Sequence, residues 1–140
     1  MNLEIALTDL FTLPFSSAME YTDDPARMQA LLNEYEGWSA MLWKFSPSLR
    51  RLVLRVYRSH EARELYVLCA GCKTIAGAFD WRGVQLRFAR EVNQQGEALY
   101  WLRDDEAGFV LSCDGGVVVS VGIPSGDWLS NFEFADDAPV

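Results

Sequence analysis

The feature that most constrains this chain is a change of hydrophobic period at Arg50. From there to Val121, apolar and polar residues alternate in short runs, and 84–89 is the clearest half-buried strand. Turn residues such as Asn93–Gly96 separate the runs, and no link has room for a crossover helix. A parallel βαβ sheet is therefore excluded, and an antiparallel meander is predicted. The strands are expected over 51–58, 65–69, 74–79, 84–89, 97–103, 108–113 and 117–121.

The first third of the chain is predicted to be helical. Residues 3–11 carry an apolar stripe at helical spacing that Pro14 ends, although alternation over 3–7 also fits a short strand. Asp24 before Pro25 is typical of a helix N-terminus, because aspartate caps the helix and proline suits its first turn. The helix expected over 25–36 has one apolar face, formed by Met28, Leu31, Leu32 and Tyr35. The same spacing from Trp38 to Phe45 predicts that helix resumes as far as Ser46.

These patterns predict an α+β fold with N-terminal helices packed on a curved antiparallel meander sheet of about six to seven strands. A small β-barrel with N-terminal helices is the alternative. We expect one domain over residues 1–140, with a flexible tail at 135–140. The apolar face of helix 25–36 is predicted to pack on the sheet face that carries Leu52, Leu54, Val56, Val84, Leu86 and Phe88.

Composition and charge exclude several classes of function. The net charge of −8 disfavours binding to nucleic acid or to an anionic membrane surface, and no apolar run is long enough to span a membrane. Glu4 and Asp9 lie where a secretory signal would need basic residues. Three cysteines cannot all pair within one chain, so a disulfide framework is not expected. A cytoplasmic location is predicted.

The sequence offers no recognisable catalytic apparatus. His60 is the sole histidine and lies among charged residues in an expected turn, where a solvated side chain is the ordinary outcome. The segment Gly122–Gly126 has Pro124 where a nucleophile elbow needs its nucleophile. We therefore expect neither an enzyme nor a bound cofactor.

Cys69 and Cys72 form the sharpest chemical motif, a pair spaced C-x-x-C. The intervening Ala70-Gly71 is typical of a hairpin turn, as is Asp114–Gly116. A zinc site would need two more ligands, and a redox pair would need a helix N-terminus after the first cysteine. We interpret the cysteines as structural and expect no metal, leaving a zinc or redox module as an alternative.

Acidic residues gather in the last third of the chain. Residues 91–140 hold ten acids and one base, a net charge of −9, which would speed encounter with a basic protein. The resulting hypothesis is a small acidic, non-catalytic protein-binding module of the adaptor, chaperone or inhibitor type. Its alternative is a small-molecule binder or enzyme with a pocket between helix and sheet. The candidate partner contacts are Asp104, Asp105, Glu106, Asp127, Trp128, Asp136 and Asp137, with 104–106 expected as a solvated hairpin tip.

The strand predicted over 97–103 is apolar on both faces. Leu99 and Trp101 lie opposite Tyr100 and Leu102, so one face is available to a partner or to a covering layer. The strand predicted over 117–121 would also be an open edge. These features favour a homodimer, with covering by residues 123–134 as the alternative.

Overall fold

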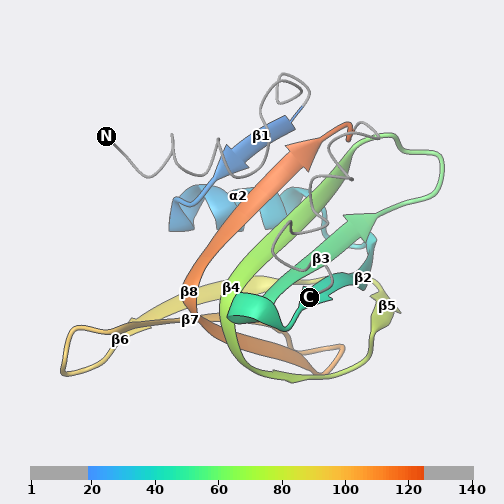
Figure 1. Ribbon diagram of the computed structural model, residues 1–140. Coiled ribbons are helices and arrows are strands. Elements are labelled where there is room, and N and C mark those ends of the chain that lie inside the picture. Colours follow the sequence, from blue (N-terminus) through green and yellow to red (C-terminus); the bar gives the residue numbers. More distant parts are fainter. Residues whose placement is uncertain (1–18, 125–140) are drawn as a thin grey trace.

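An antiparallel sheet dominates the computed structural model, which describes residues 19–124 (Figure 1). Its strand order is β5-β2-β3-β4-β8-β7-β6, and β1 pairs with β8 off this path. The elements are β1 (Met19–Thr22), α2 (Pro25–Glu34), β2 (Ser39–Ser46), η2 (Ser48–Arg50), β3 (Arg51–Tyr57), β4 (Glu64–Ala76), β5 (Asp80–Arg82), β6 (Arg87–Val92), β7 (Ala98–Asp104) and β8 (Phe109–Gly122).

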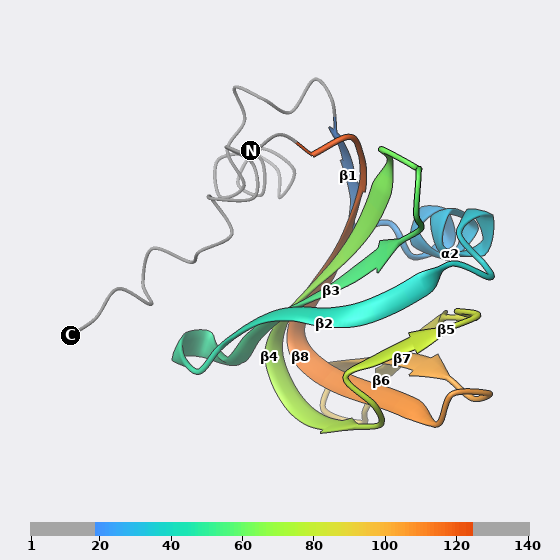
Figure 2. The same ribbon diagram turned by 90° about the vertical axis from the view of Figure 1, so that its right-hand side faces the viewer.

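The sheet curls into a half-barrel with one helix packed on it, which confirms the predicted α+β class (Figure 2). The strands do not form a simple meander, because β5 follows β4 in sequence but pairs with β2 at the far end of the sheet. Strand β8 is not an edge, since β4 lines one side of it and β7 and β1 line the other. The open-edge argument for a homodimer therefore fails at β8, and β6 is one end of the sheet.

Bends in β4 and β8 produce the curl. The turns predicted at Ala70-Gly71 and Asp114–Gly116 are wrong, because both strands continue through them. Two register shifts flank Cys72, and Gly71 has φ +65°, a combination typical of β-bulges. A Cβ on Gly115 would lie 2.8 Å from the carbonyl oxygen of Ala70. Glycine thus lets the two backbones approach closely where the sheet turns its corner.

Helix α2 begins as the sequence predicts. The Asp24 carboxylate accepts a hydrogen bond from the backbone N–H of Arg27 at 2.8 Å, and Pro25 opens the first turn. The predicted packing is confirmed. The predicted helix face and the predicted sheet residues belong to one core cluster, with Phe88 packed against it: Met28, Leu31, Leu32, Tyr35, Leu52, Leu54, Val56, Val84 and Leu86.

Two further local predictions are wrong. Residues 39–46 form strand β2 instead of a resumed helix, since they pair with β3 and β5. The strand expected over 84–89 begins only at Arg87, because Val84 exchanges backbone hydrogen bonds with Gly37 and Trp38 instead of joining the ladder. The predictions for residues 3–14 and for the tail at 135–140 lie outside the described residues.

Candidate protein-binding surface

Strands β6, β7 and the first half of β8 present a half-exposed apolar face on the outside of the curl. Their inward side chains, such as Leu102 and Leu111, are buried in the core. Side chains alternate along a strand, so the neighbours of these residues point outward. We call the outward set the Trp101 face: Ala89, Leu99, Trp101 and Val110. None of the four belongs to either buried apolar cluster of the described chain.

The Trp101 indole extends over β6. Trp101 lies directly opposite Ala89, and its Nε1 donates to the Glu91 carboxylate at 3.0 Å. The Trp101 side chain is half-buried, and the residue opposite it on β6, Ala89, is small. Arg87 and Glu91 border this region, and Arg87 also pairs with Glu36, in the turn after α2, at 3.2 Å. The face thus has an aromatic centre and a charged rim.

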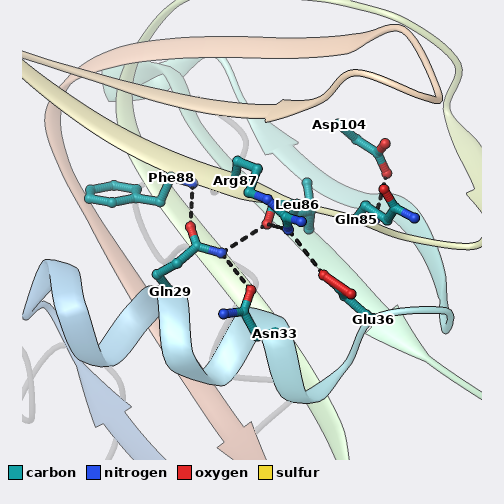
Figure 3. Close-up of polar contacts among 8 residues, drawn as sticks. All are labelled: Gln29, Asn33, Glu36, Gln85, Leu86, Arg87, Phe88 and Asp104. Atoms are coloured by element: carbon teal, nitrogen blue, oxygen red, sulfur yellow. Dashed lines mark hydrogen bonds and ion pairs between the residues drawn. The ribbon is translucent and has the colours of Figure 1, made fainter.

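A side chain of α2 covers the start of the outer edge of β6. The Gln29 amide accepts a hydrogen bond from the Phe88 N–H at 2.7 Å and donates to the Leu86 carbonyl at 3.2 Å (Figure 3). The same Nε2 donates to Asn33, which fixes the amide from the helix side. No described strand pairs with the outer edge of β6 beyond this point. Backbone groups of Arg90 and Val92 therefore lie at an edge without a described strand.

The acidic hairpin between β7 and β8 differs from the prediction. Asp104 is fully buried, and its carboxylate accepts hydrogen bonds from Trp81 Nε1, the Gln85 N–H and the Ala107 N–H at 2.8, 2.8 and 3.2 Å. The prediction that Asp104 is a solvated contact residue is thus wrong. Its carboxylate links β7 to Trp81 of β5 and to the segment that follows β5. Asp105 and Glu106 are exposed at the hairpin, as expected. The remaining candidates lie outside the described residues: Asp127, Trp128, Asp136 and Asp137.

The three cysteines gather where β4 and β8 bend. Cys72 lies opposite Cys113, and all three thiols are free and buried. Burial raises the pKa of the Cys72 thiol to about 12. The hydrogen bond with Cys113 and burial raise the pKa of Cys69 well above its ordinary value. Both thiols stay protonated near neutral pH, whereas the hydrogen bond with Cys69 lowers the pKa of Cys113. All three are buried, and buried cysteines are poorly placed for nucleophilic or redox chemistry. Within residues 19–124, no group of three or more metal-ligating residue types could hold a metal ion.

Two further polar features bear on catalysis. His60 is exposed in the turn between β3 and β4, as expected. Glu64 accepts two hydrogen bonds from the Arg55 guanidinium, at 3.0 and 2.6 Å, and a short one from the Tyr66 hydroxyl. Burial and this hydrogen bond raise the pKa of Tyr66 well above its ordinary value, so the phenol stays protonated. The network braces β3 against β4.

The sequence did not predict the network around Glu64, nor the hydrogen bonds of Gln29 to the backbone at the start of β6. Arg55 and Tyr66 are cross-strand neighbours, and their contact depends on the register of β3 with β4. Gln29 meets Phe88 across 59 residues of sequence. Neither contact leaves a local pattern. For the Trp101 face, by contrast, the sequence carries a signal, because the strand at Leu99–Leu102 is apolar on both faces.

Comparisons of this chain with protein-family models, curated proteins and solved structures found no match. The functional argument therefore depends on the geometry described above. Across residues 19–124, the structure has no helix that is long and apolar enough to cross a membrane.

Proposed function

We propose that this chain is a small acidic, non-catalytic protein-binding module of the cytoplasm, and that the Trp101 face contacts its partner. The observation that supports this most is the half-exposed pair Leu99 and Trp101, outside both buried clusters. Tryptophan is enriched among the residues that carry most of the binding energy at protein interfaces. An aromatic centre within a charged rim is also typical of such interfaces.

Charge supports a basic partner. The net charge of −8 favours encounter with a positively charged protein. Asp105 and Glu106 are exposed at the hairpin that joins two strands of the Trp101 face. Asp104 is omitted from the proposed contacts because its carboxylate is buried and fully engaged in the fold. We propose that Asp105 and Glu106 mainly affect the association rate.

The two alternatives have less support. A ligand pocket between α2 and the sheet would need open space, but buried side chains such as Met28 and Leu31 occupy that interface. A zinc module would need four ligands, but within residues 19–124 no group of three or more histidine, cysteine, aspartate or glutamate residues could hold a metal ion. A redox module would need an accessible thiolate, but all three cysteines are buried. Binding through the outer surface conflicts with neither observation.

Affinity capture with matched variants tests the proposal. The immobilised chain is exposed to lysate of its source at low and high salt, and each captured protein is purified and rebound alone. We expect Trp101→Ser to abolish binding, and Asp105→Lys with Glu106→Lys to slow association and weaken its salt dependence. Phe79→Ser is the control, because Phe79 is a highly exposed aromatic residue outside the Trp101 face. Equal binding by Trp101→Ser and the wild type, with both folded, would refute the proposal.

A further inference from the structure

We infer that the partner binds as an added β-strand along the outer edge of β6, beside the Trp101 face. The inference rests on the proposed function and names the kind of partner: an extended segment in which a basic, an acidic and an aliphatic residue follow one another. Strand addition to an exposed sheet edge is a common mode of peptide recognition, in which main-chain hydrogen bonds give affinity and alternate side chains give specificity.

The direction of the edge follows from one hydrogen bond. The Phe88 N–H donates to Gln29, so it points away from β7. In an antiparallel pair, alternate residues direct their backbone groups to opposite sides of the strand. Arg90 and Val92, two and four residues further on, therefore also direct N–H and C=O away from β7. They form an edge that no described strand occupies.

Gln29 marks where an added strand along this edge must stop. Its amide contacts Leu86 and Phe88 as a neighbouring strand would, accepting at 2.7 Å and donating at 3.2 Å. Figure 3 shows the amide reaching up from α2 to the backbone at the start of β6. An added strand is thus confined to the stretch from the Phe88 carbonyl to Val92, with α2 blocking its extension.

The side chains around that stretch define the partner. A partner residue opposite Ala89 would lie on the outer face, where the small alanine leaves the Trp101 ring within reach. A residue opposite Glu91, on the same face, would meet a carboxylate and should be basic. The residue between them would lie opposite the exposed Arg90 and should be acidic. In antiparallel orientation, the partner reads basic, acidic, aliphatic from its N-terminus.

A second copy of the chain fits this edge poorly. When two β6 strands pair about a two-fold axis, the register centred on Ala89 pairs each Arg90 with a Phe88 whose N–H is held by Gln29. The register centred on Arg90 places two Arg90 guanidinium groups opposite one another, where like charges repel. The register centred on Glu91 avoids Phe88, but it places two Glu91 carboxylates opposite one another, where like charges repel. Gln29, Arg90 and Glu91 together favour a different chain over self-pairing.

A synthetic peptide, acetyl-Thr-Thr-Lys-Glu-Ile-Thr-Thr-amide, is the probe for the full-length chain. Its glutamate should lie opposite Arg90, and binding should shift the backbone amide signals of Arg90 and Val92 in nuclear magnetic resonance spectra. N-methylation of that glutamate removes the N–H that donates to the Arg90 carbonyl and should weaken binding at least about tenfold. N-methylation of the isoleucine is the matched control, because its N–H points away from β6 and affinity should change less than about twofold.

Variants of β6 provide the second measurement. Arg90→Pro removes the edge N–H and should abolish peptide binding, while the fold tolerates proline where the N–H faces outward. Arg90→Ala keeps the N–H and should bind within about fivefold of the wild type, since only side-chain pairing is lost. Equal effects of the two N-methylations, or wild-type binding by a folded Arg90→Pro, would overturn the inference. A dimer detected by light scattering and abolished by Arg90→Pro would also overturn it.

The inference and the proposed function can fail separately. If the captured partner loses binding to Trp101→Ser but binds Arg90→Pro as it binds the wild type, strand addition is wrong and the proposed function stands. If Trp101→Ser leaves capture unchanged, the proposed function is wrong whatever the peptide does. Loss of partner binding with both variants, alongside normal binding by Arg90→Ala, supports both.

Discussion

Replacing Asp104 by asparagine is the sharpest test of how the half-barrel is held together. One carboxylate oxygen accepts from Trp81 and from the Gln85 N–H, both at 2.8 Å, and the other accepts from the Ala107 N–H at 3.2 Å. Asparagine has almost the same shape but offers one oxygen and one NH₂ group. If the oxygen keeps Trp81 and Gln85, the NH₂ group faces the Ala107 N–H, and two donors oppose each other.

The expected loss of stability in Asp104→Asn follows from these three hydrogen bonds. Hydrogen bonds to a charged group contribute roughly 1.5–3 kcal/mol and neutral ones about 1 kcal/mol. In Asp104→Asn the bonds from Trp81 and Gln85 weaken because their acceptor becomes neutral, and the bond from Ala107 is lost. Relief of a buried charge offsets part of this loss. We expect Asp104→Asn to lower the free energy of unfolding by roughly 2–4 kcal/mol. Asp105→Asn is the matched control, since this neighbour is exposed, and its effect should stay within about 0.5 kcal/mol.

Urea denaturation followed by tryptophan fluorescence and by circular dichroism measures both variants. Fluorescence is informative because Trp81, a direct partner of Asp104, should report the local change. If Asp104→Asn unfolds at the same urea concentration as Asp105→Asn, the buried hydrogen bonds contribute no net stability. If it is more stable than the wild type, desolvation of the carboxylate outweighs its bonds. Either result would refute the reasoning.

Three other perturbations have defined outcomes. Leu31→Ala should lower the free energy of unfolding by roughly 2–5 kcal/mol because Leu31 is 3% exposed in the core, and a loss below about 0.5 kcal/mol in urea denaturation would contradict the packing of α2. Gly115→Ala should lower the free energy of unfolding by roughly 1–3 kcal/mol in the same assay, since the new Cβ would lie 2.8 Å from the Ala70 carbonyl oxygen, and an unchanged urea midpoint would contradict the close approach of the two strands. Burial raises the pKa of Cys72 from 9.0 to about 12, so the folded state holds this proton more tightly and stability should fall from pH 9 upward, by at most about 1.4 kcal/mol per pH unit. Under reducing conditions, Cys72→Ala should reduce the loss of unfolding free energy above pH 9. An unchanged pH dependence of the unfolding free energy would contradict the raised pKa of Cys72.

Local chemistry explains what the sequence could predict. Asp24-Pro25 marked the start of α2 because a cap and a first-turn proline act within a few residues. The apolar face of α2 and the alternation in β3 identified most of the core, since each element buries one face.

Long-range pairing explains the failures. Trp38, Met41 and Phe45 have helical spacing, but β3 and β5 flank this segment and fix it as a strand. Gly71 and Gly115 resemble turn formers because glycine serves turns and bulges alike, and only the partner strand distinguishes them.

The candidate surface was predictable only in part. Leu99 and Trp101 stood out because their strand is apolar on both faces, and the structure places them on an outer face. Asp104 was misassigned because its neighbours Asp105 and Glu106 suggested a solvated turn, whereas its partners Trp81 and Gln85 are distant in sequence. The open edge of β6 could not be predicted, since it depends on which strands pair and on Gln29.

The position of β8 affects how the chain can fold during synthesis. It is the last described strand to leave the ribosome, yet it joins β1, β4 and β7, whose partner residues lie up to about a hundred positions earlier. Until β8 emerges, α2 and β2–β4 lack the neighbour that completes their core, and β4 exposes a long unpaired edge. Such non-local pairing slows folding and leaves unpaired edges open to aggregation. A nascent chain stalled before Phe109 should therefore bind chaperones that recognise unfolded segments, and release them once β8 is made.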